Sequence, residues 1–226
     1  MSIAERWLEV RGRVDAACVR AKRDPSSVTI VAVSKTHPAS AVIEAAAAGA
    51  TDFGENYAQE LATKRAAVAA PIRWHFIGRL QRNKAKLVAG QVALIHAVDS
   101  VDLAIELAKR RPDPAEVQPI LLALSGEDTK AGFTSETTLA AARAISEVSG
   151  VRIDGLMTMP PPSHDPETSR PDFLALRDLR HRLETDLGRS LPVLSMGMSG
   201  DFEVAIECGA THVRVGTAIF GSRPRP

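Results

Sequence analysis

Aromatic residues are scarce in this sequence, and neither sign of charge is in excess. Phe, Trp and Tyr together make up 4% of the 226 residues, and 28 Lys and Arg stand against 27 Asp and Glu, a net charge of +1. Proteins that bind nucleic acids usually carry a basic surface and aromatic side chains that stack on bases. The composition therefore predicts no nucleic-acid partner.

Cysteines and long apolar runs are also lacking. The two cysteines, Cys18 and Cys208, lie far apart in helix-like segments, and we expect both to be buried free thiols in a reducing compartment. No apolar run approaches the roughly 18 residues of a membrane span, and charges interrupt the N-terminal stretch where a signal peptide needs an apolar core. These absences predict a cytoplasmic protein that makes no membrane contact.

The sequence does have 45% hydrophobic residues, arranged in a repeating pattern. After a first amphipathic segment, in which Ile3, Trp7 and Val14 recur at helical spacing, short β-branched runs alternate with helical stretches. The expected strands are 28–33, 51–54, 73–77, 93–98, 119–124, 152–157, 192–195 and 212–215. The expected helices between them are 39–48, 57–68, 83–90, 101–110, 136–148, 171–187 and 201–209.

This alternation favours a closed (β/α)8 barrel, or TIM barrel, with an extra N-terminal helix. An open doubly wound sheet is the alternative, but its function would call for a glycine-rich dinucleotide fingerprint after the first strand, and residues 34–38 (SKTHP) contain no glycine. No linker divides the chain, so residues 1–226 are expected to form one domain. The Pro- and Ser-rich stretch 160–171 is expected to be a mobile surface connection.

Residues with useful chemistry follow several expected strands, whose carboxyl ends share one face of a barrel. Lys35 follows the first strand, and because lysine is seldom buried it has reached either solvent or a ligand. Ser199, Gly216 and Thr217 follow the seventh and eighth strands, where barrels commonly hold phosphate. The glycines of either loop alone could serve only to make a turn, but both loops together favour a phosphate site.

A lysine that faces a phosphate site suggests a phosphorylated aldehyde held as a Schiff base. Pyridoxal 5'-phosphate (PLP) fits, and it also needs a residue opposite its pyridine nitrogen. Arg214 projects to the face of its strand opposite Val213 and Val215, which suits that role; the alternative is that it pairs with an acid inside the barrel. The six histidines show no metal-ligand spacing, so no metal site is expected.

Six phrases of the sequence carry a family resemblance: AVSKTHP, FGENYAQE, WHFIGRLQRNK, KAGF, GLMTMP and LSMGMSGDFEVAIECGATHVRVGTAIFG. In their order and over nearly the whole chain they closely resemble the pyridoxal phosphate homeostasis proteins, also called the YggS or proline-synthase-co-transcribed family. The resemblance implies a fold-type-III PLP barrel, like the N-terminal domain of alanine racemase, that binds PLP and supplies or buffers it, with apo-PLP enzymes as candidate recipients.

The resemblance also implies individual roles. Lys35 would carry the Schiff base, Asn56 would lie beside the bound ring, and Arg214 would meet the pyridine nitrogen. The complete set of cofactor-binding residues that it implies is Lys35, Asn56, Met157, Ser199, Arg214, Gly216 and Thr217. Two features depart from the family pattern: the apolar segment 121–124 replaces an asparagine often found on strand five, and Arg79 adds a positive charge at the mouth of the barrel.

Two classes of enzyme are the alternatives to a carrier. A PLP-dependent racemase or decarboxylase needs acid and base groups at the bound amino acid, yet Tyr57 is the only tyrosine, it lies on the barrel, and the chain ends at the eighth strand. An arginine opposite the ring nitrogen also weakens the ring as an electron sink. For a phosphosugar aldolase, no carboxylate–lysine pair stands out beside Lys35. We therefore expect a monomeric PLP carrier without robust catalysis.

Overall fold

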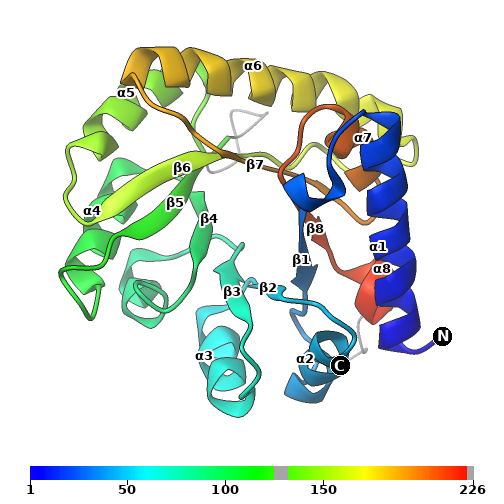
Figure 1. Cartoon of the computed structure of the whole chain (residues 1–226). Coiled ribbons are helices and arrows are strands. Elements are labelled where there is room, and N and C mark those ends of the chain that lie inside the picture. Colours follow the sequence, from blue (N-terminus) through cyan, green and yellow to red (C-terminus); the bar gives the residue numbers. More distant parts are fainter. Residues whose placement is uncertain (125–131, 223–226) are drawn as a thin grey trace.

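The computed structural model describes residues 1–124 and 132–222, and its central feature is a closed barrel of parallel strands in the order β1 to β8 (Figure 1). Strand β8 pairs with β1 and closes the ring. The strands are β1 (Thr29–Val33), β2 (Asp52–Glu55), β3 (Arg73–Phe76), β4 (Leu94–Val98), β5 (Gln118–Ala123), β6 (Val151–Met157), β7 (Val193–Met198) and β8 (His212–Val215). The predicted (β/α)8 barrel is confirmed, and each strand overlaps its predicted range.

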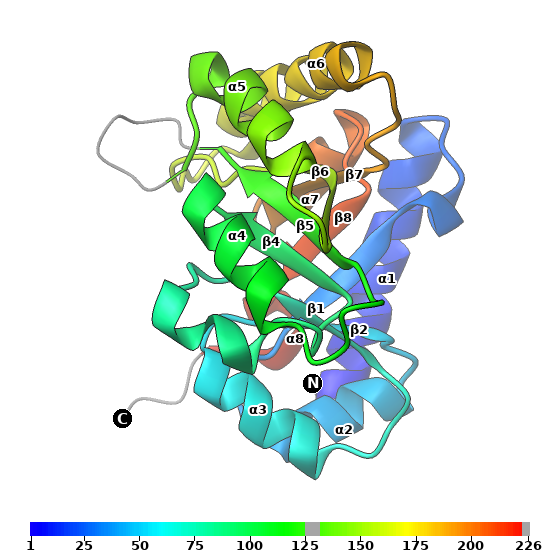
Figure 2. The ribbon, with the colours of Figure 1, turned by 90° about the vertical axis from the view of Figure 1, so that its left-hand side faces the viewer.

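Helices follow the strands along the chain and cover the outside of the barrel; turned by 90°, Figure 2 shows α4 and α5 outside the strands on the side of β4 to β6. The α-helices are α1 (Ile3–Arg20), α2 (Ala39–Ala47), α3 (Ala58–Ala67), α4 (Val101–Arg110), α5 (Ser135–Ser146), α6 (Arg170–Leu187), α7 (Phe202–Glu207) and α8 (Thr217–Phe220). The 3-10 helices are η1 (Pro25–Ser27), η2 (Arg82–Leu87) and η3 (Pro166–Ser169).

Helix α1 is the extra N-terminal helix that the sequence predicted. Ser2 and Glu5 form a capping box that satisfies its first backbone N–H groups. Its apolar stripe, which includes Trp7 and Val14, is buried, and α1 packs against α7 and α8 (Figure 1). Cys18 and Cys208 are both free and buried, as expected.

One local prediction was wrong. Within the segment 83–90, the helix is the 3-10 helix η2, which ends at Leu87, rather than an α-helix; Ala85, Val88 and Ala89 are the buried positions of the segment. The stretch 160–171 is a surface connection, as predicted, because residues 161–168 are all exposed. It contains the short 3-10 helix η3, whose Ser169 is buried, and it runs directly into α6.

The main hydrophobic core lies between the outer faces of the strands and the helices, where the largest buried side chains include Phe53, Phe173 and Phe202. Two smaller apolar clusters are separate from it; one joins Val31, Val33 and Ile77, and the other is formed by Leu94, Ala97, Leu121, Ala123, Met157 and Val193. Within the part of the chain that the structure describes, no helix is both long and apolar enough to cross a membrane.

Candidate functional site

All seven residues predicted to bind the cofactor line one cavity of about 760 Å³. They reach it from the carboxyl ends of five strands. Lys35 follows β1, Asn56 follows β2 and Met157 ends β6. Ser199 follows β7, Arg214 lies on β8, and Gly216 and Thr217 follow β8. The volume lies within the usual range of small-molecule sites. The structure therefore brings together residues that are far apart in sequence.

The turn that carries Lys35 is held on both sides of this residue. Ser34 Oγ donates to Glu55 Oε1 at 2.6 Å, and the backbone N–H of Thr36 donates to Glu60 Oε1 at 2.6 Å. Thr36 has φ +66°, a left-handed conformation that a β-branched residue adopts only when its surroundings impose it. These contacts fix the backbone from which the Lys35 side chain extends.

A buried lysine provides the other half of this anchor. Lys64 Nζ donates to Ser34 O at 2.6 Å, to Glu55 Oε1 at 2.7 Å and to Glu60 Oε1 at 2.8 Å. Burial raises the pKa of Glu55, although its hydrogen bonds with Lys64 and Ser34 oppose that shift. Lys64 thus pairs with two carboxylates and binds the carbonyl of Ser34, next to Lys35.

Asn56 is placed by a close approach of two backbones. A Cβ atom on Gly78 would lie 2.3 Å from Asn56 O, so only glycine allows the loop after β3 to pack there. The Oδ1 atom of Asn56 is buried and has no hydrogen-bond partner among the described residues. A buried acceptor without a donor is costly, and this one lines the cavity.

The loops after β7 and β8 meet at Ser199. Its Oγ atom accepts from the backbone N–H of Gly216 at 3.2 Å and from that of Ala218 at 3.4 Å. Asp201 shapes the β7 loop, since its carboxylate accepts from Met198 N at 2.7 Å and from Ser169 Oγ at 3.0 Å. Backbone amides and a hydroxyl therefore converge on one end of the cavity.

Arg214 lies at the cavity with its side chain buried in the barrel. Its Nη1 donates to Ser195 Oγ at 2.6 Å and its Nη2 donates to Thr158 O at 2.9 Å. The alternative prediction, that Arg214 pairs with a carboxylate inside the barrel, does not hold for these two hydrogen bonds, because a hydroxyl and a backbone carbonyl accept them. Burial lowers the pKa of Arg214 to about 10, an effect that Asp201 opposes, so the guanidinium remains charged at neutral pH.

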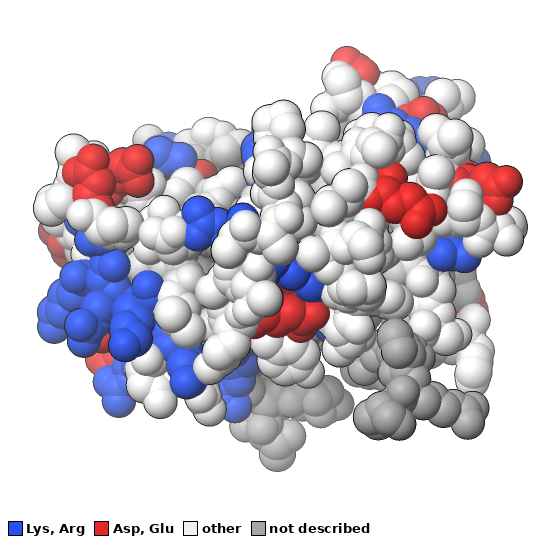
Figure 3. Space-filling model, turned by 90° about the horizontal axis from the view of Figure 1, so that it is seen from below, with Lys and Arg blue, Asp and Glu red and all other residues white. Residues whose placement is uncertain are grey.

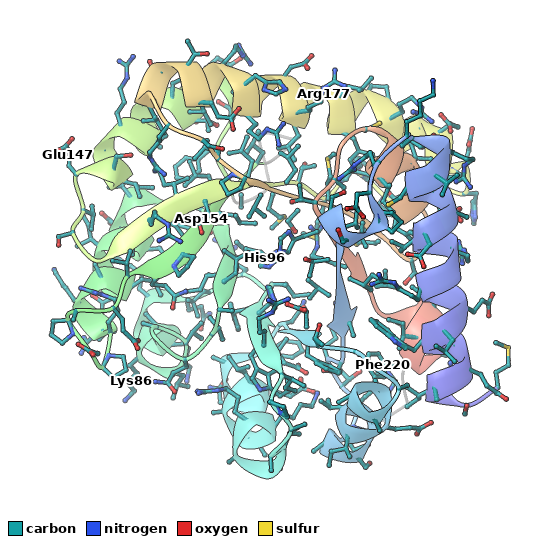
Figure 4. All side chains as sticks on the ribbon, in the orientation of Figure 1. Lys86, His96, Glu147, Asp154, Arg177 and Phe220 are labelled. Atoms are coloured by element: carbon teal, nitrogen blue, oxygen red, sulfur yellow. The ribbon has the colours of Figure 1, made fainter. Side chains whose placement is uncertain are left out.

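The walls of the cavity are mixed. Ala123 and Leu124 form an apolar wall where the sequence lacks the strand-five asparagine, and Pro160 and Pro161 also line the cavity. Arg79 is mostly exposed; it pairs with Asp99 at 3.4 Å, and both residues also line a second cavity of about 940 Å³. Seen from below, basic side chains gather on the left of the molecule (Figure 3), the side on which Lys86 lies in Figure 4.

Sequence reasoning missed several residues that support the site: Lys64, Glu55, Ser195, His75 and His96. Each is a polar residue within an otherwise apolar, buried strand or helix face, and this is the one sign of it in the sequence. The sequence does not show which residue it contacts, because each has a partner on another element. Lys130 of the KAGF phrase lies outside the described residues. In the part of the chain that the structure covers, no group of three or more His, Cys, Asp or Glu side chains is arranged for a metal ion.

Comparisons with known proteins identify the family of this chain. Residues 14–224 match the family described as alanine racemase, N-terminal domain. The pyridoxal phosphate homeostasis protein of Pseudomonas aeruginosa is 44% identical, over 98% of this chain and 96% of its own length. The protein of the same name from Escherichia coli K12 is 39% identical, over 98% of this chain and 97% of its own length.

Solved structures give the same result. PipY of Synechococcus elongatus, solved with PLP bound, has a TM-score of 0.83 and 35% identity, covering 97% of this chain and 100% of its own. Alanine racemase of Corynebacterium glutamicum has a TM-score of 0.75 at 18% identity over 97% of this chain and 61% of its own, a likeness of fold alone.

The barrel and the residues at its mouth thus define a protein of the alanine racemase N-terminal class. Within this class, the chain shares 39–44% sequence identity with pyridoxal phosphate homeostasis proteins over nearly their full length. The chain belongs to the pyridoxal phosphate homeostasis protein family, as its sequence phrases predicted.

Proposed function

We propose that this protein binds PLP at Lys35 and takes part in PLP homeostasis by supplying or buffering the cofactor, without turning over amino acids at an enzymatic rate. The observation that carries the proposal is the convergence of Lys35, the Ser199–Gly216 loops and the buried Arg214 on one cavity. The names of its relatives and the PLP in PipY support the same function.

The residues present fit PLP. The cavity offers an amine for an aldehyde, two backbone amides and hydroxyls for a phosphate, and a cationic donor for a ring nitrogen. The buried Oδ1 of Asn56, which has no donor among the described residues, can accept a hydrogen bond from a ligand. When bound, PLP supplies an electrophilic aldehyde and a ring that can withdraw electrons.

Each residue has a defined task in binding. Lys35 supplies the amine, and the anchored turn around it fixes its approach. Ser199, Gly216 and Thr217 would hold the phosphate, Asn56 and Met157 would contact the ring, and Arg214 would donate to the ring nitrogen; all six line the cavity. The cavity opening would let water or an incoming amine reach Lys35, which would free the cofactor for an apo-PLP enzyme.

Two features favour a carrier over a racemase or decarboxylase. Tyr57, the only tyrosine, is 57% exposed and lines the second cavity rather than the first. Arg214 remains protonated, so it donates to the ring nitrogen and keeps that atom unprotonated, which weakens its pull on electrons. Without a placed acid–base partner, proton transfer loses about 10²–10⁴-fold in rate.

The proposal extends to the setting of the protein. We place it in the cytoplasm, which suits two buried free cysteines, and we propose that residues 1–226 act as one domain and as a monomer. PLP is its small-molecule partner and apo-PLP enzymes are the recipients.

The experiment loads the protein with PLP, removes the excess and mixes it with an apo-aminotransferase; Lys35→Ala serves as the control. The loaded wild type should reactivate the apo-enzyme, and the control, carried through the same steps, should not. A panel of L- and D-amino acids in deuterium oxide should show negligible exchange, racemisation or decarboxylation. Turnover of any of them at about 1 s⁻¹ or faster would contradict the carrier function.

A further inference from the structure

The interior of this barrel contains a column of polar side chains where such barrels are usually filled by branched apolar residues. The column consists of Asp52, His75, His96, Ser195 and Arg214, which come from five different strands and are all buried. His96 lies in the middle of the ring of strands (Figure 4). The column runs from the start of β2 up to the cavity.

Every neighbouring pair in the column is within hydrogen-bond distance. Arg214 Nη1 lies 2.6 Å from Ser195 Oγ, and Ser195 Oγ lies 2.8 Å from His96 Nδ1. His96 Nε2 lies 3.0 Å from His75 Nδ1, and His75 Nε2 lies 2.9 Å from Asp52 Oδ1. The Asp52 carboxylate also accepts two hydrogen bonds from Arg73 at 2.8 Å.

When both imidazoles are neutral, the two ends of the column allow only one direction for these bonds. A guanidinium has no acceptor and a carboxylate has no proton to donate, so Arg214 must donate to Ser195, and Asp52 must accept from His75. Between them, Ser195 then donates to His96 and His96 donates to His75. In this arrangement each imidazole carries its proton on Nε2.

The charges agree with this direction. The acceptor atoms of Ser195, His96 and His75 point toward the Arg214 cation, and their donated protons point toward the Asp52 anion. The dipoles of these groups are therefore aligned, and each hydrogen bond strengthens the next. Burial holds the pKa of His96 well below its usual value, and the nearby Arg214 cation acts in the same direction. Hydrogen bonds from His75, Arg73 and Thr51 outweigh burial and hold the pKa of Asp52 below its usual range.

Stability alone does not account for such a column. Buried ionic groups replaced together by apolar residues of similar volume often leave a protein as stable or more stable. In this arrangement the hydroxyl proton of Ser195 is donated to His96. The Ser195 Oγ atom therefore acts toward Arg214 only as an acceptor. The guanidinium then has two fixed acceptors, Ser195 Oγ and Thr158 O.

We propose that Asp52, His75, His96 and Ser195 form a positioning relay that orients Arg214 as a hydrogen-bond donor at the floor of the cavity. His96 is the central member, because it alone connects the serine from β7 to the histidine from β3. The role of the relay toward a ligand rests on the proposed binding of PLP, whose ring nitrogen Arg214 would meet.

The first test needs no ligand. Nitrogen-15 NMR of the histidine side chains should show His75 and His96 as neutral Nε2–H tautomers at pH 7. A Nδ1–H tautomer or a charged ring at either position would overturn the relay.

The second test measures affinity for PLP and for its 1-deaza analogue, in which C–H replaces the ring nitrogen. Wild type should prefer PLP by about 10- to 100-fold, as for a charge-assisted hydrogen bond. His96→Phe, which has no acceptor for Ser195, should lose most of that preference. His96→Gln should keep it, because its amide can accept from Ser195 and donate to His75.

The matched control is His212→Phe. His212 lies beside His75 and His96, at ring-centroid distances of 6.0 and 6.1 Å, but its recorded hydrogen bond goes to Thr211 outside the relay. This variant should keep the preference for PLP, whatever its stability.

The outcomes separate the two proposals. If wild type prefers PLP but His96→Phe keeps the same preference, the relay is overturned while PLP binding stands. If wild type binds both ligands equally, Arg214 does not meet the ring nitrogen and the relay has no role in recognition. If wild type binds neither, the proposed function fails, and the tautomers decide whether the relay exists.

Discussion

At the scale of single residues, this site depends on charged groups that are removed from water. Lys64 has a side chain only 5% exposed and contacts Glu55, whose side chain is fully buried, at 2.7 Å. Removing one partner from such a pair leaves the other charge buried and uncompensated, which costs more than the pair contributes. Lys64 therefore governs both stability and the turn that carries Lys35.

Lys64→Met should lower the free energy of unfolding by about 3–5 kcal/mol, measured by urea denaturation at pH 7. Adding Glu55→Gln should recover part of that loss, because the variant then buries one carboxylate fewer. The control is Lys109→Met on the exposed face of α4, which should cost less than about 0.5 kcal/mol. A loss from Lys64→Met as small as that of the control would contradict the role of the buried pair.

At the scale of elements, the loops after β7 and β8 form the end of the cavity at which we propose that the phosphate of PLP binds. Gly197 has φ +88°, which favours glycine, and a Cβ there would lie 2.5 Å from Ala205 Cβ. The chain can therefore turn tightly between β7 and α7 and present Ser199 to Gly216 and Ala218.

Removing a hydroxyl from these loops should weaken phosphate binding selectively. Ser199→Ala and Thr217→Val should each weaken the affinity for PLP by about 10- to 100-fold, because each removes a hydrogen bond to a charged group. Affinity for pyridoxal, which lacks the phosphate, should hardly change in a fluorescence titration. An equal loss for both ligands would show that these loops do not hold phosphate.

The elements also show how far sequence reasoning reached. Strands and their carboxyl-end residues were predictable, since Lys35 and Ser199 are placed by local pattern and by the geometry common to all such barrels. The relay was not, because His96 acquires its role only from the strand register that brings Ser195 and His75 to it. Helix α8 spans only four residues, Thr217–Phe220, too short to give a helical period.

At the scale of the whole molecule, the neutral His96 makes stability depend on pH. Because the pKa of His96 is lowered on folding, the unfolded chain binds a proton below about pH 6.5 that the folded chain does not bind. Its contribution to stability is therefore present above that pH and is lost as the pH falls. Asp52, His75, His212 and Arg214 are the titratable groups that act on it or share its column.

The free energy of unfolding should consequently fall between pH 6.5 and 5, and one proton accounts for at most about 1.4 kcal/mol per pH unit of that slope. His96→Gln should be less stable at pH 7 but show a slope shallower by up to this amount. Urea denaturation across the pH range measures it, with His181→Gln on α6 as the control for loss of an imidazole. An unchanged slope in His96→Gln would contradict a neutral, buried His96.

The central claim is that PLP attaches to Lys35. The direct measurement is to load the protein with PLP, reduce it with borohydride, digest it and locate the added pyridoxyl mass by tandem mass spectrometry. The account predicts that the peptide containing Lys35 carries the mass and that Lys35→Arg abolishes the label. A pyridoxyl group found on Lys64 or another lysine, with the Lys35 peptide unmodified, would contradict it.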